Sequence, residues 1–154
     1  MTHPALLALA TFGAIATAAS AAAVSFSPAP TSFSATGVLN LASLQTGTKC
    51  EITLKGRVNK KGVGKIDSLT FAGNSQCAGT TATALPWKVL ASGASLGKIV
   101  GFGFSGSFFG DCGSGTVPFT DDASGDWSLS ATLPSGCTVN GFLNTTPPIV
   151  IVSP

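Results

Sequence analysis

A hydrophobic period of two is the feature of this sequence that most constrains its fold. From Cys50 to Val58, apolar residues and glycine alternate with charged and polar residues, and the alternation returns at 85–89, 127–133 and 137–143. Successive side chains of a β-strand point to opposite faces, so this period predicts strands with one buried and one solvated side. Turn signals rich in Gly, Asn and Ser separate these runs at intervals of roughly ten residues.

The pattern predicts an all-β fold, a single antiparallel β-sandwich or barrel-like domain of about 8 to 10 short strands. No stretch after residue 23 shows the apolar stripe of a helix. The expected strands lie near residues 24–27, 32–39, 50–58, 64–72, 85–91, 98–105, 116–119, 126–133, 137–144 and 148–152.

Residues 1–23 are predicted to be a signal peptide that is cleaved after Ala23. An apolar run extends from Ala5 to Ala19 without an acidic residue, and small residues that offer A-x-A cleavage sites follow it. The amino-terminal end lacks the usual Lys or Arg, so a short membrane anchor is the alternative, although the run is short for a spanning helix. Residues 24–154 are then expected to form a single β-sandwich domain without a transmembrane segment. We expect this product to be secreted to the cell surface or the medium, or to stay in the periplasm.

The four cysteines, Cys50, Cys77, Cys112 and Cys137, all lie in the part expected to be exported. An even number of cysteines in an oxidising compartment predicts two disulfides, and four cysteines allow three pairings. We favour Cys50–Cys77 with Cys112–Cys137, because each bridge then closes a loop of similar size within one half of the chain. A zinc site is disfavoured, because zinc ligands come in closely spaced pairs and these cysteines are 27, 35 and 25 residues apart.

The composition argues against several classes of function. A net charge of +2 is too small for a nucleic-acid binder. The one histidine, His3, belongs to the expected signal peptide, so residues 24–154 contain no base for a Ser-His-Asp triad. A Ser-Lys dyad, or a carboxylate pair among Asp121, Asp122 and Asp126, is the hydrolase alternative, and the same acidic cluster is a weak calcium candidate. We therefore expect a protein that is not an enzyme and that holds neither a metal nor a cofactor.

A phenylalanine–glycine run at residues 99–110 is the main candidate for hydrophobic contacts. In an extended chain Phe102, Phe104 and Phe108 share one face, while two glycines leave the other face bare for the close approach of a backbone, a ring or an apolar ligand. The run is either a core strand or an exposed apolar stripe that marks a contact surface. For the second alternative, the candidate hydrophobic contact residues are Phe102, Phe104, Phe108 and Phe109.

Two further features bear on self-association. The apolar run Ile149–Val152 is either the last core strand or a free edge that adds to the sheet of another subunit. Six of the eight basic residues fall between Lys49 and Lys65, and four of the six acidic residues fall between Asp111 and Asp126. These two regions are either ordinary solvated surfaces or complementary ends that orient copies of the chain.

An ordered set of short motifs resembles a known family. The motifs are Thr31–Gly37, Thr53–Gly56 after Cys50, Ile66–Phe71 before Cys77, Leu85-Pro86-Trp87, Ser135–Gly141 and Ile149–Val152. Together they are similar to the secreted bacterial protein activator of alkane oxidation family, the PraB-like proteins. The resemblance implies an exported accessory protein that promotes growth on long-chain alkanes by helping cells contact or disperse the substrate, and it implies no catalytic residue.

The leading hypothesis is therefore a secreted, non-catalytic accessory protein that acts at the interface of a hydrophobic substrate, an alkane, or at the cell surface. The alternative is a structural subunit of a cell-surface fibre or extracellular matrix.

Overall fold

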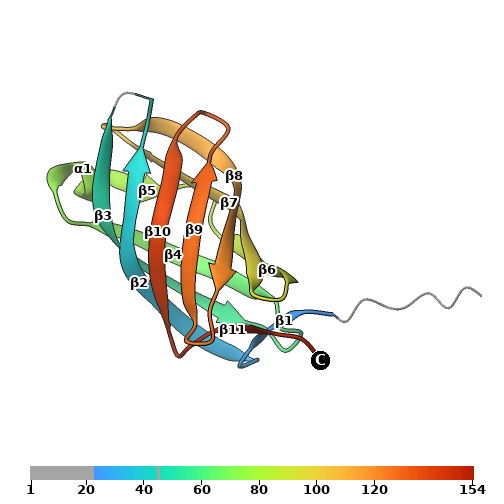
Figure 1. Ribbon diagram of the computed structural model, residues 1–154. Coiled ribbons are helices and arrows are strands. Elements are labelled where there is room, and N and C mark those ends of the chain that lie inside the picture. Colours follow the sequence, from blue (N-terminus) through green and yellow to red (C-terminus); the bar gives the residue numbers. More distant parts are fainter. Residues whose placement is uncertain (1–22, 45) are drawn as a thin grey trace, which may run out of the picture.

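The computed structural model describes residues 23–44 and 46–154 (Figure 1). The expected signal peptide, apart from Ala23, lies outside the described residues. The elements are β1 (Ser25–Ser27), β2 (Thr31–Ala42), β3 (Gly47–Val58), β4 (Gly64–Ala72), α1 (Ser75–Ala78), β5 (Thr80–Ala82), β6 (Trp87–Gly93), β7 (Leu96–Gly106), β8 (Gly110–Asp121), β9 (Asp126–Thr132), β10 (Thr138–Thr146) and β11 (Val150–Val152).

Eight of these strands form a closed antiparallel barrel. Strands β2, β3, β4, β6, β7, β8, β9 and β10 pair in chain order, and β10 then pairs with β2. The predicted all-β class is confirmed, and of the two predicted architectures the structure is the barrel rather than the sandwich. Closure leaves the main sheet without an open edge that runs its full length.

Each run expected from the alternation contains a strand. On β3, the buried residues Cys50, Ile52, Leu54, Gly56 and Val58 occupy the inward face, whereas the residues that alternate with them are exposed. Two short elements, α1 and β5, were not expected. Strand β5 has only three residues and no alternation. It pairs with Phe104–Gly106 of β7, beyond the segment Leu96–Val100 that pairs with β6.

Two aromatic clusters fill the barrel. In the first, the rings of Phe119 and Trp127 stack at 4.5 Å, and Phe26 and Phe33 pack against Trp127. In the second, Trp87 contacts Phe102 at 4.6 Å, and the contacts continue from ring to ring through Phe104 and Phe109 to Phe108. The inward face of the strands is therefore a packed core.

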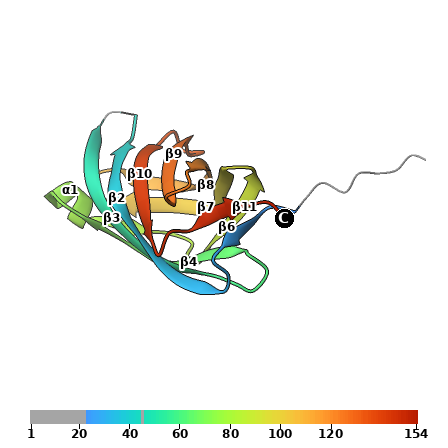
Figure 2. The ribbon, with the colours of Figure 1, turned by 60° about the horizontal axis from the view of Figure 1, so that its bottom comes forward.

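A two-stranded ribbon crosses one end of the barrel, which Figure 2 turns toward the viewer. It consists of β1 and β11, which pair antiparallel with Ser25 opposite Val152. On one side the Phe26 N–H donates to Gly62 O in the β3–β4 turn, and on the other the Ile151 N–H donates to Asp121 Oδ2 at the end of β8. The ribbon thus ties both ends of the described chain to the barrel.

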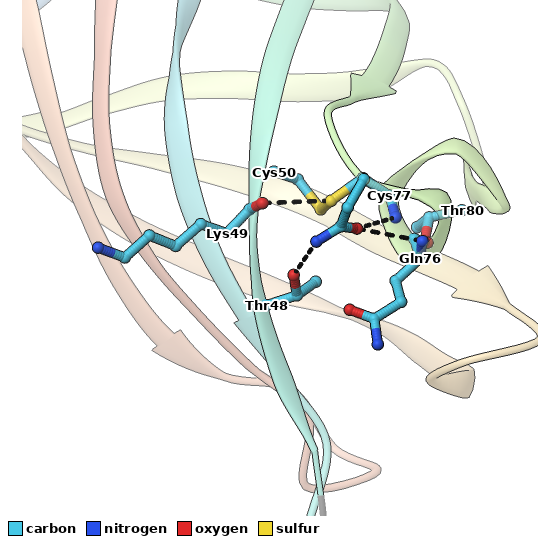
Figure 3. Close-up of a disulfide and its surroundings, with 7 residues drawn as sticks. Thr48, Lys49, Cys50, Gln76, Cys77 and Thr80 are labelled. Carbon is cyan, nitrogen blue, oxygen red and sulfur yellow. Dashed lines mark hydrogen bonds between the residues drawn. A yellow bond between two sulfur atoms is a disulfide. The ribbon is translucent and has the colours of Figure 1, made fainter.

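Both predicted disulfides are present, Cys50–Cys77 and Cys112–Cys137. The first joins β3 to α1 (Figure 3), where Cys77 Sγ lies 3.3 Å from the carbonyl oxygen of Lys49. The side chain of Asn74 supports this junction: its amide donates to Thr48 Oγ1, and its oxygen accepts from the N–H groups of the first turn of α1. The second joins β8 to the β9–β10 turn.

Candidate functional site

The structure places most of the phenylalanine–glycine run inside the barrel. Phe102 and Phe104 are 1% and 0% exposed and belong to the second aromatic cluster, and Phe109 is also buried. Of the two alternatives left open by the sequence, these three side chains thus lie in the core rather than in an exposed stripe. For Phe102 and Phe104 the reason is that β7 is a barrel strand, so the face that carries its large side chains points to the interior.

The bare face of the run has the role expected of glycine. A Cβ at Gly103 would lie 2.4 Å from the carbonyl oxygen of Gly113 on β8 and 2.6 Å from Thr83 Oγ1. Only a residue without a side chain allows this close approach of a neighbouring backbone. At Gly103 the group that approaches the bare face is therefore a backbone of the same protein.

Phe108, the remaining residue of the run, is partly buried at the end of the barrel opposite the ribbon. With Phe109 it lines a shallow hollow of about 310 Å³ between the β2–β3, β7–β8 and β9–β10 turns. Leu44 of the β2–β3 turn lines the same hollow and is 86% exposed. This end therefore offers a small apolar surface to the solvent.

An aromatic side chain that is more exposed than Phe108 lies on the outer wall of the barrel. Phe142 of β10 is 66% exposed, and Val38 of β2, which lies directly opposite in the strand register, is 46% exposed. Directly opposite residues in antiparallel strands have Cβ atoms about 4.5–5.5 Å apart, so the two side chains form one apolar spot. We call Val38 and Phe142, with the polar residues around them, the β2–β10 patch.

Polar side chains surround this apolar centre. Two residues along each strand from the Val38–Phe142 pair, the Asn40 side-chain amide donates to Asn140 Oδ1 at 3.0 Å. A groove of about 530 Å³ runs along the patch, and Lys49 and Ser128 are among its other lining residues. The patch therefore combines an exposed ring with uncharged hydrogen-bonding groups and one cation.

Two glycines let β2 and β10 approach closely beneath the patch. A Cβ at Gly37 would lie 1.9 Å from the carbonyl oxygen of Phe142, and a Cβ at Gly141 would lie 2.2 Å from that of Val38. Side chains at these positions would push the strands apart. The two glycines thus allow the close approach of the two strands that carry the apolar pair.

Phe142 and Val38 were not predicted as contact residues from the sequence, although the alternation along β10 contains the signal for Phe142. On β10, Val139 and Leu143 point inward, so Phe142 occupies the solvent phase between Asn140 and Asn144. A large apolar residue in the polar phase of a strand is the observation that finds such a surface without a structure.

The acidic cluster is engaged in its own turn. Asp122 Oδ1 accepts from the N–H groups of Ser124 and Asp126, and Asp126 accepts from the side-chain amide of Asn144. Within the described ranges, no three His, Cys, Asp or Glu side chains come together as a metal-binding group.

Asp121 is the buried member of this cluster. Its Oδ2 accepts from Ile151 N–H at 2.7 Å, while its Oδ1 is buried without a partner. Burial raises the pKa of Asp121, and the Ile151 hydrogen bond offsets part of that effect. This carboxyl group fixes the ribbon to the barrel, so its contacts are structural.

The acidic β8–β9 turn and the basic β3–β4 turn lie at the same end of the barrel. Both contact the ribbon, through Asp121 and Gly62 respectively. The two oppositely charged turns therefore do not lie at opposite ends of the barrel, as complementary ends that orient copies of the chain would. Strand β11 pairs with β1 of its own chain, and Ile149 before it is buried.

Comparison with known protein families decides the relationship of the chain. The family model described as alkane oxidation protein activator PraA/PraB-like matches residues 1–153. The chain belongs to this family. No curated protein and no solved structure is significantly similar to it.

The family assignment confirms the resemblance seen in the motifs. The name of the family describes an activator of alkane oxidation. The two disulfides of this PraA/PraB-like protein are compatible with a location outside the cytoplasm. Its α1 is the one helix among residues 23–44 and 46–154, and it is far shorter than a membrane-spanning helix.

Proposed function

We propose that this PraA/PraB-like protein is a secreted, non-catalytic accessory protein that promotes alkane utilisation by acting at hydrophobic interfaces. The family match over residues 1–153 is the observation that carries the link to alkanes. Export through cleavage of residues 1–23 is part of the proposal. It is supported by the sequence of that segment and by the position of β1, which begins two residues after Ala23.

The β2–β10 patch is the proposed contact surface. Phe142 can transfer from water to an oil phase or an apolar surface without any change in the barrel, because its ring already lies outside the core. Leu44 and Phe108, at the end of the barrel opposite the ribbon, are a second, smaller proposed contact. Of the residues first considered, Phe108 keeps a proposed contact role, with Phe109 beneath it, whereas Phe102 and Phe104 are assigned to the core.

The test is the interfacial tension between hexadecane and buffer with purified residues 24–154. We expect the protein to lower the tension, and we expect Val38→Ser/Phe142→Ser to lose most of that effect while its circular dichroism spectrum is unchanged. Leu96→Ser is the matched control, because Leu96, the first residue of β7, is 50% exposed and does not belong to the patch. A wild-type protein no more surface-active than an ordinary globular protein would refute the proposed function.

Export has its own test. Expression of the full chain in a bacterium with a general secretion pathway should give a processed protein outside the cytoplasm, and amino-terminal sequencing should begin at Val24. A product that keeps Met1 and remains attached to the inner membrane would instead support the membrane-anchor alternative.

The fibre-subunit alternative can be tested on the same material. Assembly by strand addition would require β11 to leave β1, and Asp121 would lose its hydrogen bond to Ile151. A protein that remains monomeric in sedimentation at high concentration would exclude this route to fibres.

A further inference from the structure

Three cations lie side by side on the outer wall of the barrel, on the side of β3, β4 and β6. Arg57 of β3 is directly opposite Lys65 of β4, and Lys65 is directly opposite Lys88 of β6. Like charges in directly opposite positions destabilise a sheet. We therefore expect this row of charges to destabilise the barrel, so stability does not explain why the three cations are adjacent.

The row is only partly neutralised by the protein. Asp67 lies 3.2 Å from Arg57 and 3.6 Å from Lys65. No other ion pair joins acidic and basic side chains in the described ranges, so Lys88 has no carboxylate partner there. Lys60 and Lys61 at the tip of the β3–β4 hairpin add two more positive charges nearby. An anion that approaches this side of the barrel meets a net positive surface.

The same three cations border a groove with apolar walls. It measures about 290 Å³, and Val63 and Pro86 are among its other lining residues. Ligand sites for drug-sized molecules begin at ~300 Å³, so the groove has room for a head group and the first part of a chain rather than for a complete long-chain molecule. A positively charged rim above an apolar floor fits an amphiphile with an anionic head.

We propose that the groove bordered by Arg57, Lys65 and Lys88 binds the carboxylate head and first methylenes of an alkyl carboxylate. This inference rests on the proposed function for its choice of ligand. Terminal oxidation of an alkane leads through the alcohol and the aldehyde to the carboxylic acid, which is an anion at neutral pH. The pairing of Asp67 with Arg57 and Lys65 shows that a carboxylate fits against these cations.

The site lies apart from the β2–β10 patch. Arg57 is near the C-terminal end of β3, whereas Lys49, which lines the groove along the patch, is near its N-terminal end. An alkane interface and an alkyl carboxylate could thus be held at the same time, by different surfaces of one barrel.

The experiment uses ¹⁵N-labelled residues 24–154 titrated with decanoate below its micelle concentration, followed by amide chemical shifts. We expect saturable shifts at Val63, Lys65 and Lys88, and weaker binding as NaCl is added. Acetate tests the head group alone, and decanol tests the chain without the charge. Both are expected to bind at least five-fold more weakly than decanoate.

Lys88→Glu separates binding from folding. It should raise the dissociation constant for decanoate roughly five-fold or more, as expected for loss of an ion pair at an exposed site. The melting temperature should not fall, because the new carboxylate would face Lys65. Lys49→Glu is the matched control, with the same change of charge on the distant end of β3, and it should leave the dissociation constant within two-fold.

Three results would overturn the proposal: decanol binding as tightly as decanoate, acetate binding as tightly as decanoate, or equal effects of Lys49→Glu and Lys88→Glu. None of these results bears on the hexadecane interface, where tension is measured without a carboxylate. Failure of the carboxylate site and failure of the proposed function are therefore distinguishable.

Discussion

Replacement of two phenylalanines by alanine, one at a time, should have opposite effects on stability and on adsorption to oil. Phe104 is 0% exposed and contacts Phe71, Phe102 and Phe109, whereas Phe142 is 66% exposed on the outer wall. Phe104→Ala removes core contacts and leaves a cavity. Phe142→Ala removes an exposed ring that contributes little to the folded state.

The size of both effects follows from burial. A buried Phe→Ala change costs about 3–5 kcal/mol of unfolding free energy. Phe142→Ala should cost less than about 1 kcal/mol, the range of a cross-strand pair such as that with Val38. Burial of a whole Phe side chain is worth ~1.5–3 kcal/mol, so the exposed two-thirds of Phe142 supplies about 1–2 kcal/mol to adsorption, or roughly a 5- to 25-fold change in the adsorption constant.

The assay combines guanidinium unfolding with adsorption isotherms at a hexadecane–buffer interface. Phe104→Ala should lower the denaturant midpoint strongly and, where it is still folded, adsorb as the wild type does. Phe142→Ala should keep the midpoint and adsorb less. The reasoning is refuted if Phe104→Ala keeps its stability and loses adsorption, because Phe104 would then have to be exposed.

Three further changes test the buried carboxyl group of Asp121, one disulfide, and the close approach of β2 and β10. Burial raises the pKa of Asp121 above 3.8, so as the pH rises the unfolded chain loses this proton before the folded protein does, and stability falls through that window and stays lower above it. Asp121→Asn, which can still accept from Ile151 N–H, should therefore raise the urea midpoint at pH 7, and this gain should disappear near pH 3; an equal gain at both pH values would contradict the assignment. Cys50→Ala/Cys77→Ala opens a loop with a sequence separation of 27 and should lower the unfolding free energy by about 3.5 kcal/mol in the chain-entropy estimate, measured by the same titration. Gly37→Ala places a Cβ 1.9 Å from a backbone oxygen of β10 and should destabilise the barrel by more than ~1 kcal/mol, and a neutral result in thermal melting would show that β2 and β10 can separate without cost.

The sequence predicted the strands because their signal is local. Alternation along β3 fixes which residues are buried without reference to any other strand, and the loops closed by the two disulfides follow from the spacing of the cysteines along the chain. The choice between sandwich and barrel could not be made in this way. It depends on the pairing of β10 with β2, for example Phe142 with Val38, which are more than a hundred residues apart.

The candidate site was predicted less well, for a physical reason. In the run at residues 99–110, phenylalanine alternates with glycine rather than with polar residues, so the pattern does not say which face is solvated, and either face was compatible with packing. In the barrel the bare face receives the backbone of β8, and the rings fill the core. The β2–β10 patch was not predicted, because its apolar centre forms only when Phe142 of β10 pairs with Val38 of β2.

The β1–β11 ribbon can form only after both of its strands, which lie far apart in the sequence, have been synthesised. Ser25 pairs with Val152, so a chain synthesised from its N-terminus holds β1 without its partner strand until β11 has been synthesised. Contacts this distant in sequence form late. We therefore expect the ribbon to form after the barrel strands that precede β11 in the chain. For the same reason the two ends are neighbours in space, and a circular permutant that joins them should fold with the ribbon already assembled.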